Sequence, residues 1–370
     1  MTYSLKVLGI ESSCDDTAAS IIEVYHDNNY LTKAKIDSSI VYNQSDIHSI
    51  FGGIVPELAA RAHVEKLDVC VEAALSRAGQ ALDDIDIVSV TSGPGLIGGI
   101  ISGVMFAKGL AFGIDKPLVG VNHLAGHALT PRLTNSIQYP YLILIASGGH
   151  CQFLIVTSAS DFKRLGGTID DAPGEAFDKT AKILGLEYPG GPSVERRALD
   201  GDPDSIMLPR PLIKQKNCDM SFSGLKTALR REVEKIRNHK GVVSDTEINN
   251  LCAGFQKAMV DIFVEKTKNA MAFFRTYYPD FPQTIAIAGG VAANKAIGKA
   301  LSGAAKNYNF ELIIPEARLC TDNAAMIAYA GSEVYLSKNW SSQTLIPRPR
   351  WPLDEAAKPM LGSGKRGRKS

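Results

Sequence analysis

Cysteine is scarce in this sequence and forms no recognisable pattern. The six cysteines are scattered along the chain without a Cys-x-x-Cys pair, at positions 14, 70, 151, 218, 252 and 320. Paired spacings mark thiolate zinc sites, and dense cysteines mark small disulfide-bonded secreted domains. The lack of both patterns excludes these two classes and predicts reduced thiols in a cytosol-like compartment.

Net charge and long apolar runs are also lacking. The formal net charge is +1, so bulk charge argues neither for nor against a nucleic-acid partner. The most apolar stretch runs from Gly93 to Gly113, but its Gly-Pro-Gly opening and internal Lys108 predict a buried helix. No signal or transit segment stands before the first strand, so we expect a cytoplasmic protein without membrane contact.

Two segments share one design, which is an apolar strand, a turn of small polar residues and a second strand. They cover residues 7–22 and 141–156, and residues 285–294 form a buried strand that enters a Gly-Gly turn and a helix. Small residues at strand ends let backbone N–H groups approach a phosphate or a ribose. The repeat predicts a nucleotide held between two duplicated α/β lobes.

Apolar periodicity predicts strands and helices in both halves of the chain. Strands are expected at 7–25 (a hairpin), 38–41, 85–90, 117–121, 141–156 (a hairpin), 284–288 and 310–314. Helices are expected at 56–78, from the Gly93–Gly95 turn to 112, and at 124–133, 174–184, 223–238, 246–277, 292–304 and 323–337. Asn122 is the expected N-cap of the helix at 124–133.

His123 and His127 stand four residues apart on one expected helix, so both imidazoles face the same way. This spacing suits two ligands of one metal ion, and the alternative is a partly buried polar pair between the lobes. Zincin-type proteases need Glu directly after the first His, and Leu124 disfavours that chemistry here. Asp322, at the head of the last helix, is either an N-cap or a third metal ligand.

Other polar residues have a functional and an ordinary interpretation. Asp178 beside Lys179 is either a ligand contact or a solvated pair on a helix. Gly191, in a Gly-Gly-Pro turn with Glu195 nearby, either binds a ligand or only turns the chain. Asn294 either meets a ribose or base, or serves as a first-turn residue of its helix.

One basic stripe is the best local candidate for RNA contact. It follows Ser221-Phe-Ser-Gly-Leu-Lys226 along the expected helix, with two lysines before it: Lys214, Lys216, Arg230, Arg231, Lys235, Arg237 and Lys240. Such a run is more often a solvated helix face than an RNA site.

A series of motifs resembles the universal tRNA threonylcarbamoyladenosine transferase family, bacterial TsaD type, over about residues 5 to 353. The matching pieces in the first half are Gly9-Ile-Glu-Ser-Ser-Cys-Asp-Asp-Thr17, Gly52-Gly-Ile-Val-Pro-Glu-Leu-Ala-Ala-Arg61, Gly93-Pro-Gly-Leu-Ile-Gly98 and His123-Leu-Ala-Gly-His127. Those in the second half are Ser147-Gly-Gly-His150, Asp170-Asp-Ala-Pro-Gly-Glu-Ala-Phe-Asp-Lys-Thr180, Tyr188-Pro-Gly-Gly-Pro192, Ser221-Phe-Ser-Gly-Leu-Lys226, Ala288-Gly-Gly-Val-Ala-Ala-Asn294 and Cys320-Thr-Asp-Asn323.

The resemblance implies an actin/hexokinase/Hsp70-like (ASKHA) fold with two ribonuclease-H-like lobes. The first lobe would comprise residues 1–137 and a returning helix at about 323–340. The second would comprise 138–322 with a helical insertion at about 188–280, leaving 341–370 as a flexible, Pro-rich basic tail. One divalent metal ion, iron or zinc, would be held by His123, His127 and Asp322. Substrate and nucleotide contacts would come from Ala146, Ser147, Gly148, Gly149, His150, Asp178, Gly191, Glu195 and Asn294.

The implied reaction transfers threonylcarbamoyl from threonylcarbamoyl adenylate to the exocyclic amine of an adenosine beside the anticodon, and releases AMP. The tRNAs would be those that read codons beginning with A, and ATP, ADP or AMP could also occupy the nucleotide site. The residues identify no general base, and neither His150 nor Glu11 is assigned that role.

The implied partners are tRNA, an inactive paralogue of TsaB type that pairs through the first lobe, and a P-loop ATPase of TsaE type. A homodimer is the alternative for an organellar form. Ala146 and His150 around the Ser-Gly-Gly turn resemble bacterial or organellar relatives, which favours the bacterial cytoplasm over a mitochondrial origin. The competing functions are an ATP-dependent small-molecule kinase and a non-catalytic nucleotide-binding scaffold of the same superfamily.

Overall fold

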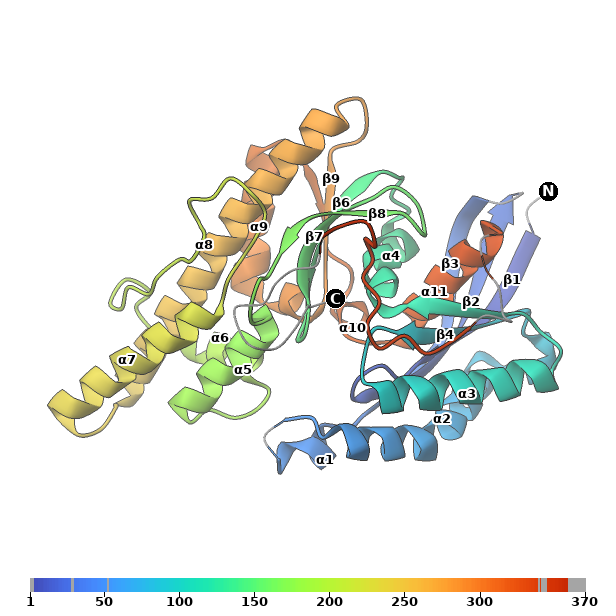
Figure 1. Cartoon of the computed structure of the whole chain (residues 1–370), viewed down its shortest axis with the longest axis horizontal. Helices are drawn as coiled ribbons and strands as arrows, with labels where there is room; N and C mark the ends of the chain where they lie inside the picture. The colour runs from blue at the N-terminus through green and yellow to red at the C-terminus, as the bar shows by residue number, and fades with distance from the viewer. Residues whose placement is uncertain (1–2, 28–29, 52, 339, 341–344, 359–370) are drawn as a thin grey trace.

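Each half of the chain builds a five-stranded sheet, and the two sheets lie in separate lobes (Figure 1). The computed structural model describes residues 3–27, 30–51, 53–338, 340 and 345–358. None of the helices in this described part combines the length and the apolarity that crossing a membrane requires.

The first sheet has the strand order β3-β2-β1-β4-β5. Its strands are β1 (Tyr3–Glu11), β2 (Asp16–Asp27), β3 (Tyr30–Asn43), β4 (Ile87–Gly93) and β5 (Leu118–Asn122). The first three strands are antiparallel neighbours, and β4 and β5 extend the sheet in parallel with β1. Every residue of β4 is buried, which fits this inner position, because parallel strands are covered on both faces.

The second sheet repeats this plan with the order β10-β9-β6-β7-β8. Its strands are β6 (Tyr141–Ala146), β7 (Cys151–Val156), β8 (Phe162–Gly167), β9 (Thr284–Ala288) and β10 (Glu311–Ile313). Again the first three strands are antiparallel, and the last two run parallel to the first. The predicted duplication of an α/β lobe is therefore confirmed.

The helices cover the two sheets. The helices of the first half are α1 (Ser45–Ser49), α2 (Pro56–Ala78), α3 (Ile97–Gly113) and α4 (His123–Asn135), with a 3-10 turn η1 (Leu82–Asp84). Those of the second half are α5 (Pro173–Leu184), α6 (Gly190–Ala198), α7 (Ser223–Lys240), α8 (Asp245–Tyr277), η2 (Gly290–Ala293), α9 (Lys295–Asn307), α10 (Ala317–Cys320) and α11 (Ala324–Leu336). The last helix, α11, returns to the first lobe and packs on all five strands of its sheet.

One hydrophobic core joins the lobes. It contains residues of β1 and β5, of β6 and β9, and of α4 and α11, which pack against each other. Separate cores lie beneath α2 and α3 in the first lobe and around α8 in the second. All six cysteines are free, as their spacing predicts.

The structure corrects several element predictions. The stretch 188–220 contains the helix α6, and β8 and the short α1 lie in segments for which no element is predicted. The helix expected at 292–304 begins instead at Lys295, after the turn η2. Part of the predicted flexible tail, residues 345–358, packs against both lobes, whereas 341–344 and 359–370 lie outside the described residues.

Candidate functional site

The histidine pair lies on the first two turns of α4, directly after β5 ends. Asn122 caps this helix, because its side-chain oxygen accepts the backbone N–H groups of Leu124 (2.9 Å) and Ala125 (3.4 Å). The predicted N-cap is thus confirmed. Both imidazoles are buried, and their ring centroids lie 4.8 Å apart.

Asp322 lies between α10 and α11 and points at both histidines. Its Oδ1 is 3.1 Å from His127 Nε2 and 3.5 Å from His123 Nε2. The N-cap interpretation of Asp322 is wrong, because Asn323 caps α11 by accepting the N–H of Met326 at 3.0 Å. The carboxylate is therefore available for another role.

These three residues fit a metal ion. One ligand atom from each can be chosen so that all three lie within 4.8 Å of one another. Bonds of about 2.1 Å in tetrahedral geometry place neighbouring ligands about 3.4 Å apart, close to the observed N–O distances. In both histidines it is Nε2 that faces the carboxylate, which leaves the Nδ1 atoms on the outer side of the cluster. Two imidazoles and one carboxylate suit zinc or iron(II).

Glu11, at the end of β1, orients His123 by contacting Nδ1, the ring nitrogen that does not face Asp322. Its Oε2 is 2.9 Å from His123 Nδ1 and accepts the Thr91 hydroxyl at 2.5 Å, while its Oε1 accepts the Ser13 N–H at 2.6 Å. A carboxylate on the outer ring nitrogen fixes the tautomer of a metal-binding histidine. Sequence reasoning missed this role, and the only sequence signal was a charged residue that ends a buried strand.

The charges of this cluster support one another. Burial disfavours the charged form of each group, but Glu11 and Asp322 together raise the pKa of His123 well above its ordinary value. The same attraction overcomes burial at Asp322, whose pKa lies well below its ordinary value, and at Glu11, whose pKa is also lowered. The pocket is thus built to hold positive charge between two carboxylates.

The turn between β6 and β7 exposes backbone donors. Gly148 and Gly149 are exposed, nothing lies within 4 Å of where a Cβ would stand, and neither N–H donates a hydrogen bond among the described residues. The turn is closed by Ser147 N–H donating to the His150 carbonyl at 2.8 Å. Consecutive open N–H groups of this kind form an anion-binding concavity.

Two other segments pack against this turn at contact distance. A Cβ on Gly174, in the first turn of α5, would stand 2.7 Å from the Gly148 Cα. Gly289 follows β9 with φ of +95°, and a Cβ there would stand 2.5 Å from the Ala146 carbonyl oxygen. The structure therefore brings the Ser-Gly-Gly and Gly-Gly turns together, as a shared phosphate site requires.

The remaining predicted contacts form two pairs on the second lobe. Asp178 on α5 accepts the Gly190 N–H at 2.8 Å, which places it beside Gly191 at the start of α6. Burial raises the pKa of Asp178 despite that hydrogen bond. Glu195 accepts the Lys295 N–H at 2.8 Å, so it lies next to Asn294.

Asn294 has a structural role as well. Its Oδ1 accepts the Ile297 N–H at 3.0 Å and so caps α9, while its Nδ2 donates to Gln256 at 3.0 Å. It is therefore the N-cap of that helix and not a residue within its first turn.

Tyr188, which precedes α6, connects the two parts of the site electrostatically. Burial and the carboxylates of Asp178, Asp15 and Asp16 raise its pKa to about 12. Asp178 belongs to the second lobe, whereas Asp15 lies in the first hairpin turn of the first lobe and Asp16 is the first residue of β2. Carboxylates of both lobes therefore act on the Tyr188 hydroxyl.

Asp170 is a second residue that sequence reasoning missed. It accepts the N–H groups of Phe222 (2.7 Å) and Ser223 (3.2 Å) and the hydroxyls of Ser221 and Ser223. These hydrogen bonds outweigh burial and lower the pKa of Asp170. Asp170 is thus a remote cap for the Ser-Phe-Ser segment and fixes the start of α7 beside α5.

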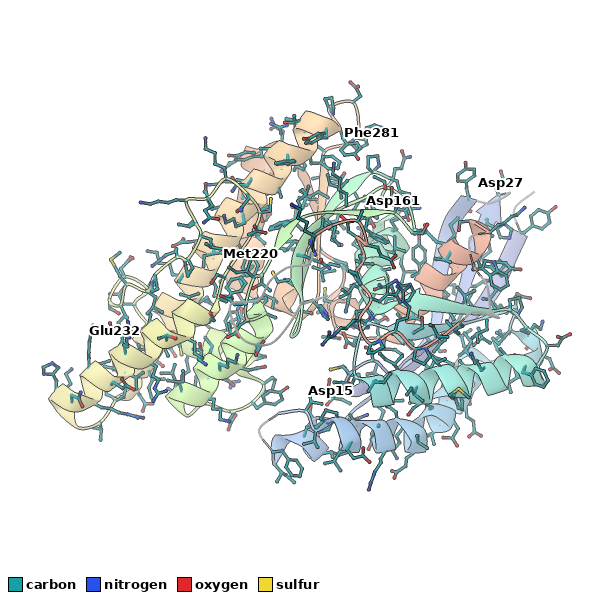
Figure 2. All side chains as sticks on the ribbon, in the orientation of Figure 1. Asp15, Asp27, Asp161, Met220, Glu232 and Phe281 are labelled. Atoms are coloured by element: carbon teal, nitrogen blue, oxygen red, sulfur yellow. The ribbon has the colours of Figure 1, made fainter. Side chains whose placement is uncertain are left out.

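The basic stripe lies on α7, at the edge of the second lobe, where Figure 2 labels Glu232. Three of its cations form ion pairs with carboxylates, namely Arg230 with Glu234, Lys235 with Glu232, and Lys240 with Glu247. In the part of the chain that the structure describes, the stripe members without such a pair are Lys214, Lys216, Arg231 and Arg237. Contact with RNA stays a prediction.

Comparisons with known proteins point in one direction. The profile of the TsaD family, described as tRNA N6-adenosine threonylcarbamoyltransferase, matches residues 35–329. Proteins with that name from Ruegeria pomeroyi and Paracoccus denitrificans are each 55% identical over 370 residues, covering 100% of both chains. The solved structure of T. kodakarensis HypF aligns with a TM-score of 0.55 at 14% identity, over 93% of this chain and 49% of that one. That likeness concerns the fold alone, and it agrees with the expected ASKHA architecture.

Proposed function

This chain belongs to the TsaD family of tRNA N6-adenosine threonylcarbamoyltransferases, and from that premise we propose that it modifies adenosine in tRNA by threonylcarbamoyl transfer. The proposed donor is threonylcarbamoyl adenylate, and the acceptor is the exocyclic amine of the adenosine next to the anticodon. The observation that carries the proposal is the His123–His127–Asp322 cluster, in which the fold brings three potential metal ligands together. It occurs in a chain that aligns over its full length with relatives of that name.

The reaction needs positioning more than a strong catalytic base. The N6 nitrogen attacks the carbamoyl carbon, the bond from that carbon to the phosphate oxygen breaks, and AMP leaves with the electron pair. The amine loses one proton, for which the described residues identify no dedicated acceptor. When both reactants are bound and correctly oriented, most of the rate acceleration comes from their orientation and from stabilisation of the charge that develops.

His123, His127 and Asp322 would hold one iron or zinc ion. Such an ion supplies Lewis acidity, which polarises a carbonyl oxygen of the donor. Glu11 keeps the Nδ1 side of His123 occupied, which leaves Nε2 directed at Asp322. Both imidazoles are buried, whereas the Asp322 side chain is 24% exposed, so the ligand set is open on the side of that carboxylate.

The donor phosphate would lie on the open N–H groups of Gly148 and Gly149. This placement is supported by the close packing of Gly174 and Gly289 around that turn, which leaves the donors fixed before binding. Asp178, Gly191, Glu195 and Asn294 would contact the adenosine. His150 closes the turn through its carbonyl, and its ring is assigned no catalytic role.

An apolar stripe on α3 supports a paired assembly. Ile97, Ile101, Met105 and Phe112 follow one another along this helix and are 49%, 45%, 58% and 90% exposed, respectively. Exposed stripes of this kind mark protein interfaces. We infer that an inactive paralogue of TsaB type covers the stripe, with a homodimer as the competing outcome and a TsaE-type ATPase as a further partner.

The transfer assay tests the enzymatic proposal. Purified protein and its proposed partners receive synthetic threonylcarbamoyl adenylate and unmodified tRNA, and nucleosides are read by mass spectrometry. Product and AMP should form in equal amounts and disappear with a chelator or in His123→Ala. His239→Ala, an exposed histidine on α7, is the matched control and should keep full activity.

Other outcomes would change the assignment. Phosphorylation of a small alcohol by ATP, without transfer to tRNA, would favour the kinase. Nucleotide binding without any product would favour a scaffold. Ile101→Glu should leave the monomer folded and abolish pairing, and unchanged pairing by analytical ultracentrifugation would remove the stripe from the interface.

A further inference from the structure

Residues 345–358, called the strap here, cross from the first lobe to the second. Figure 1 shows them in red, between β4 and β8. They line a cavity of about 580 Å³ whose other walls come from both lobes, including Ser92, Asn122 and Asp161, the last of which is labelled in Figure 2. A segment without helix or strand keeps this position only through specific contacts with each lobe.

The strap is bound to the first lobe mainly through its backbone. The Arg348 N–H donates to the Ser92 carbonyl at 2.6 Å, and the Gly95 N–H donates to the Pro349 carbonyl at 3.2 Å. Gly93 adopts φ of +141°, and a Cβ there would stand 1.8 Å from the Arg348 carbonyl oxygen. The Gly-Pro-Gly turn therefore admits the strap, a role that its sequence did not reveal.

The strap is bound to the second lobe at the edge strand β8. Asp354 Oδ2 accepts the Arg164 N–H at 2.9 Å, and Arg164 also donates from its side chain to the Lys358 carbonyl. The same aspartate closes a turn by accepting the N–H groups of Ala356 and Ala357 at 3.1 and 2.9 Å. Asp354 is thus the anchor at this end.

Between the two anchors the strap touches the metal-site helix. The Trp351 carbonyl accepts a hydrogen bond from Asn122 Nδ2 at 2.9 Å. The other atom of that amide, Oδ1, caps α4 immediately before His123. An amide can make both contacts in one orientation only, because the flipped group would direct N–H donors at the helix N–H groups.

We propose that the strap is a positioning element for the metal site. Its Trp351 carbonyl locks the Asn122 amide, and the locked amide holds the first turn of α4, which carries His123 and His127. Asn122 and the strap act through the ligands and contact no substrate. This inference rests on the proposed metal site, but its effect on α4 is measurable without any metal.

The test uses the full-length chain and four variants, of which the fourth is a stability control described with the readouts. Asn122→Ser keeps an N-cap oxygen of similar strength and removes only the donor to Trp351. Asp354→Ala releases the far anchor without touching α4. Glu355→Ala, the matched control, removes a neighbouring carboxylate that contacts only Arg348 within the strap.

Two readouts separate positioning from general stability. Hydrogen exchange of metal-free protein should accelerate over residues 122–127 in Asn122→Ser and Asp354→Ala, but not in Glu355→Ala. Zn²⁺ affinity, measured with a competing chelator, should fall about 10–100-fold in the same two variants, as expected when the support of a ligand is lost. Ser244→Ala, which removes the N-cap of α8, controls for a loss of stability elsewhere and should leave Zn²⁺ affinity unchanged.

The outcomes are distinct. Unchanged exchange over residues 122–127 in both variants would overturn the proposal. Faster exchange with unchanged Zn²⁺ affinity would also overturn it, because the strap would then stabilise α4 without positioning the ligands. A third outcome is faster exchange in both variants together with a wild-type protein that binds neither Zn²⁺ nor Fe²⁺. That result would support the contact between the strap and α4 and would refute the metal site itself.

Discussion

Replacing Glu11 by Gln tests the arrangement behind the metal site. The substitution keeps the size of the side chain but turns one oxygen into an NH₂ group. In the structure both oxygens accept hydrogen bonds, one from the Ser13 N–H and the other from Thr91 and His123. The new NH₂ group would therefore face a donor on one side or the other, whichever way the amide turns.

Metal affinity should fall because Glu11→Gln removes the carboxylate that orients the His123 ring. Without the carboxylate, the remaining partner of Nδ1 is the Ser13 hydroxyl at 3.1 Å, which can donate or accept and therefore does not fix the tautomer. Carboxylate supports of a ligating histidine contribute about 10–100-fold to metal affinity. That factor corresponds to about 1.4–2.7 kcal/mol of binding free energy. In the metal-free protein, the pKa of His123 should also fall, because Glu11 is one of the two carboxylates that raise it.

Competition with a chromogenic chelator at pH 7 measures the first effect, and histidine NMR titration measures the second. Glu57→Gln makes the same chemical change at an exposed position on α2 and serves as the control. A Zn²⁺ affinity for Glu11→Gln within twofold of wild type would refute the assigned role. The residue would then be a buried structural acid that lies near the site.

Two further predictions concern stability, and both are read from urea unfolding. Asp170→Ala should lower the free energy of unfolding by about 2–4 kcal/mol at pH 7, because it strips acceptors from Ser221 and Ser223. Folding lowers the pKa of Asp170, so its stabilising contribution is fully present above pH 3.8, the ordinary pKa of an aspartate. The contribution is lost as the pH falls through the lower pKa of the folded state, and the difference in stability between Asp170→Ala and wild type should therefore shrink in acid. Arg132→Met should lower the free energy of unfolding by about 3–5 kcal/mol, because it leaves the Glu333 carboxylate buried without the guanidinium that lies 2.8 Å away. For each of the two variants, a loss below 1 kcal/mol would refute the structural role assigned to the replaced residue.

Local patterns allowed much of the fold to be predicted. Two hairpins with small polar turns indicated the duplication, since strand propensity and turn chemistry both act over a few residues. The i, i+4 spacing of His123 and His127 indicated a shared face for the same reason. The N-cap at Asn122 could be located because a capping side chain needs only its own helix.

Contacts between distant segments could not be predicted. Glu11 and His123 are separated by 112 positions, and no local pattern relates them. Asp170 caps a helix that begins some fifty residues later, so capping rules based on adjacent residues do not find it. The strap was expected to be flexible because it is rich in proline and charge, yet backbone hydrogen bonds and a glycine turn of the first lobe hold it.

The placement of the two half-sites has a mechanical consequence. The proposed metal ligands come from α4 and from the turn just before α11. These two helices share the core that joins the lobes and are linked by the Arg132–Glu333 ion pair. The turn proposed to bind phosphate, at Gly148 and Gly149, is instead an exposed loop of the second lobe. Movement of one lobe would therefore change the distance between metal and phosphate sites while leaving the ligand set intact. A donor that spans both sites would select the lobe arrangement that matches its length, so closure around the correct adenylate would itself contribute to specificity.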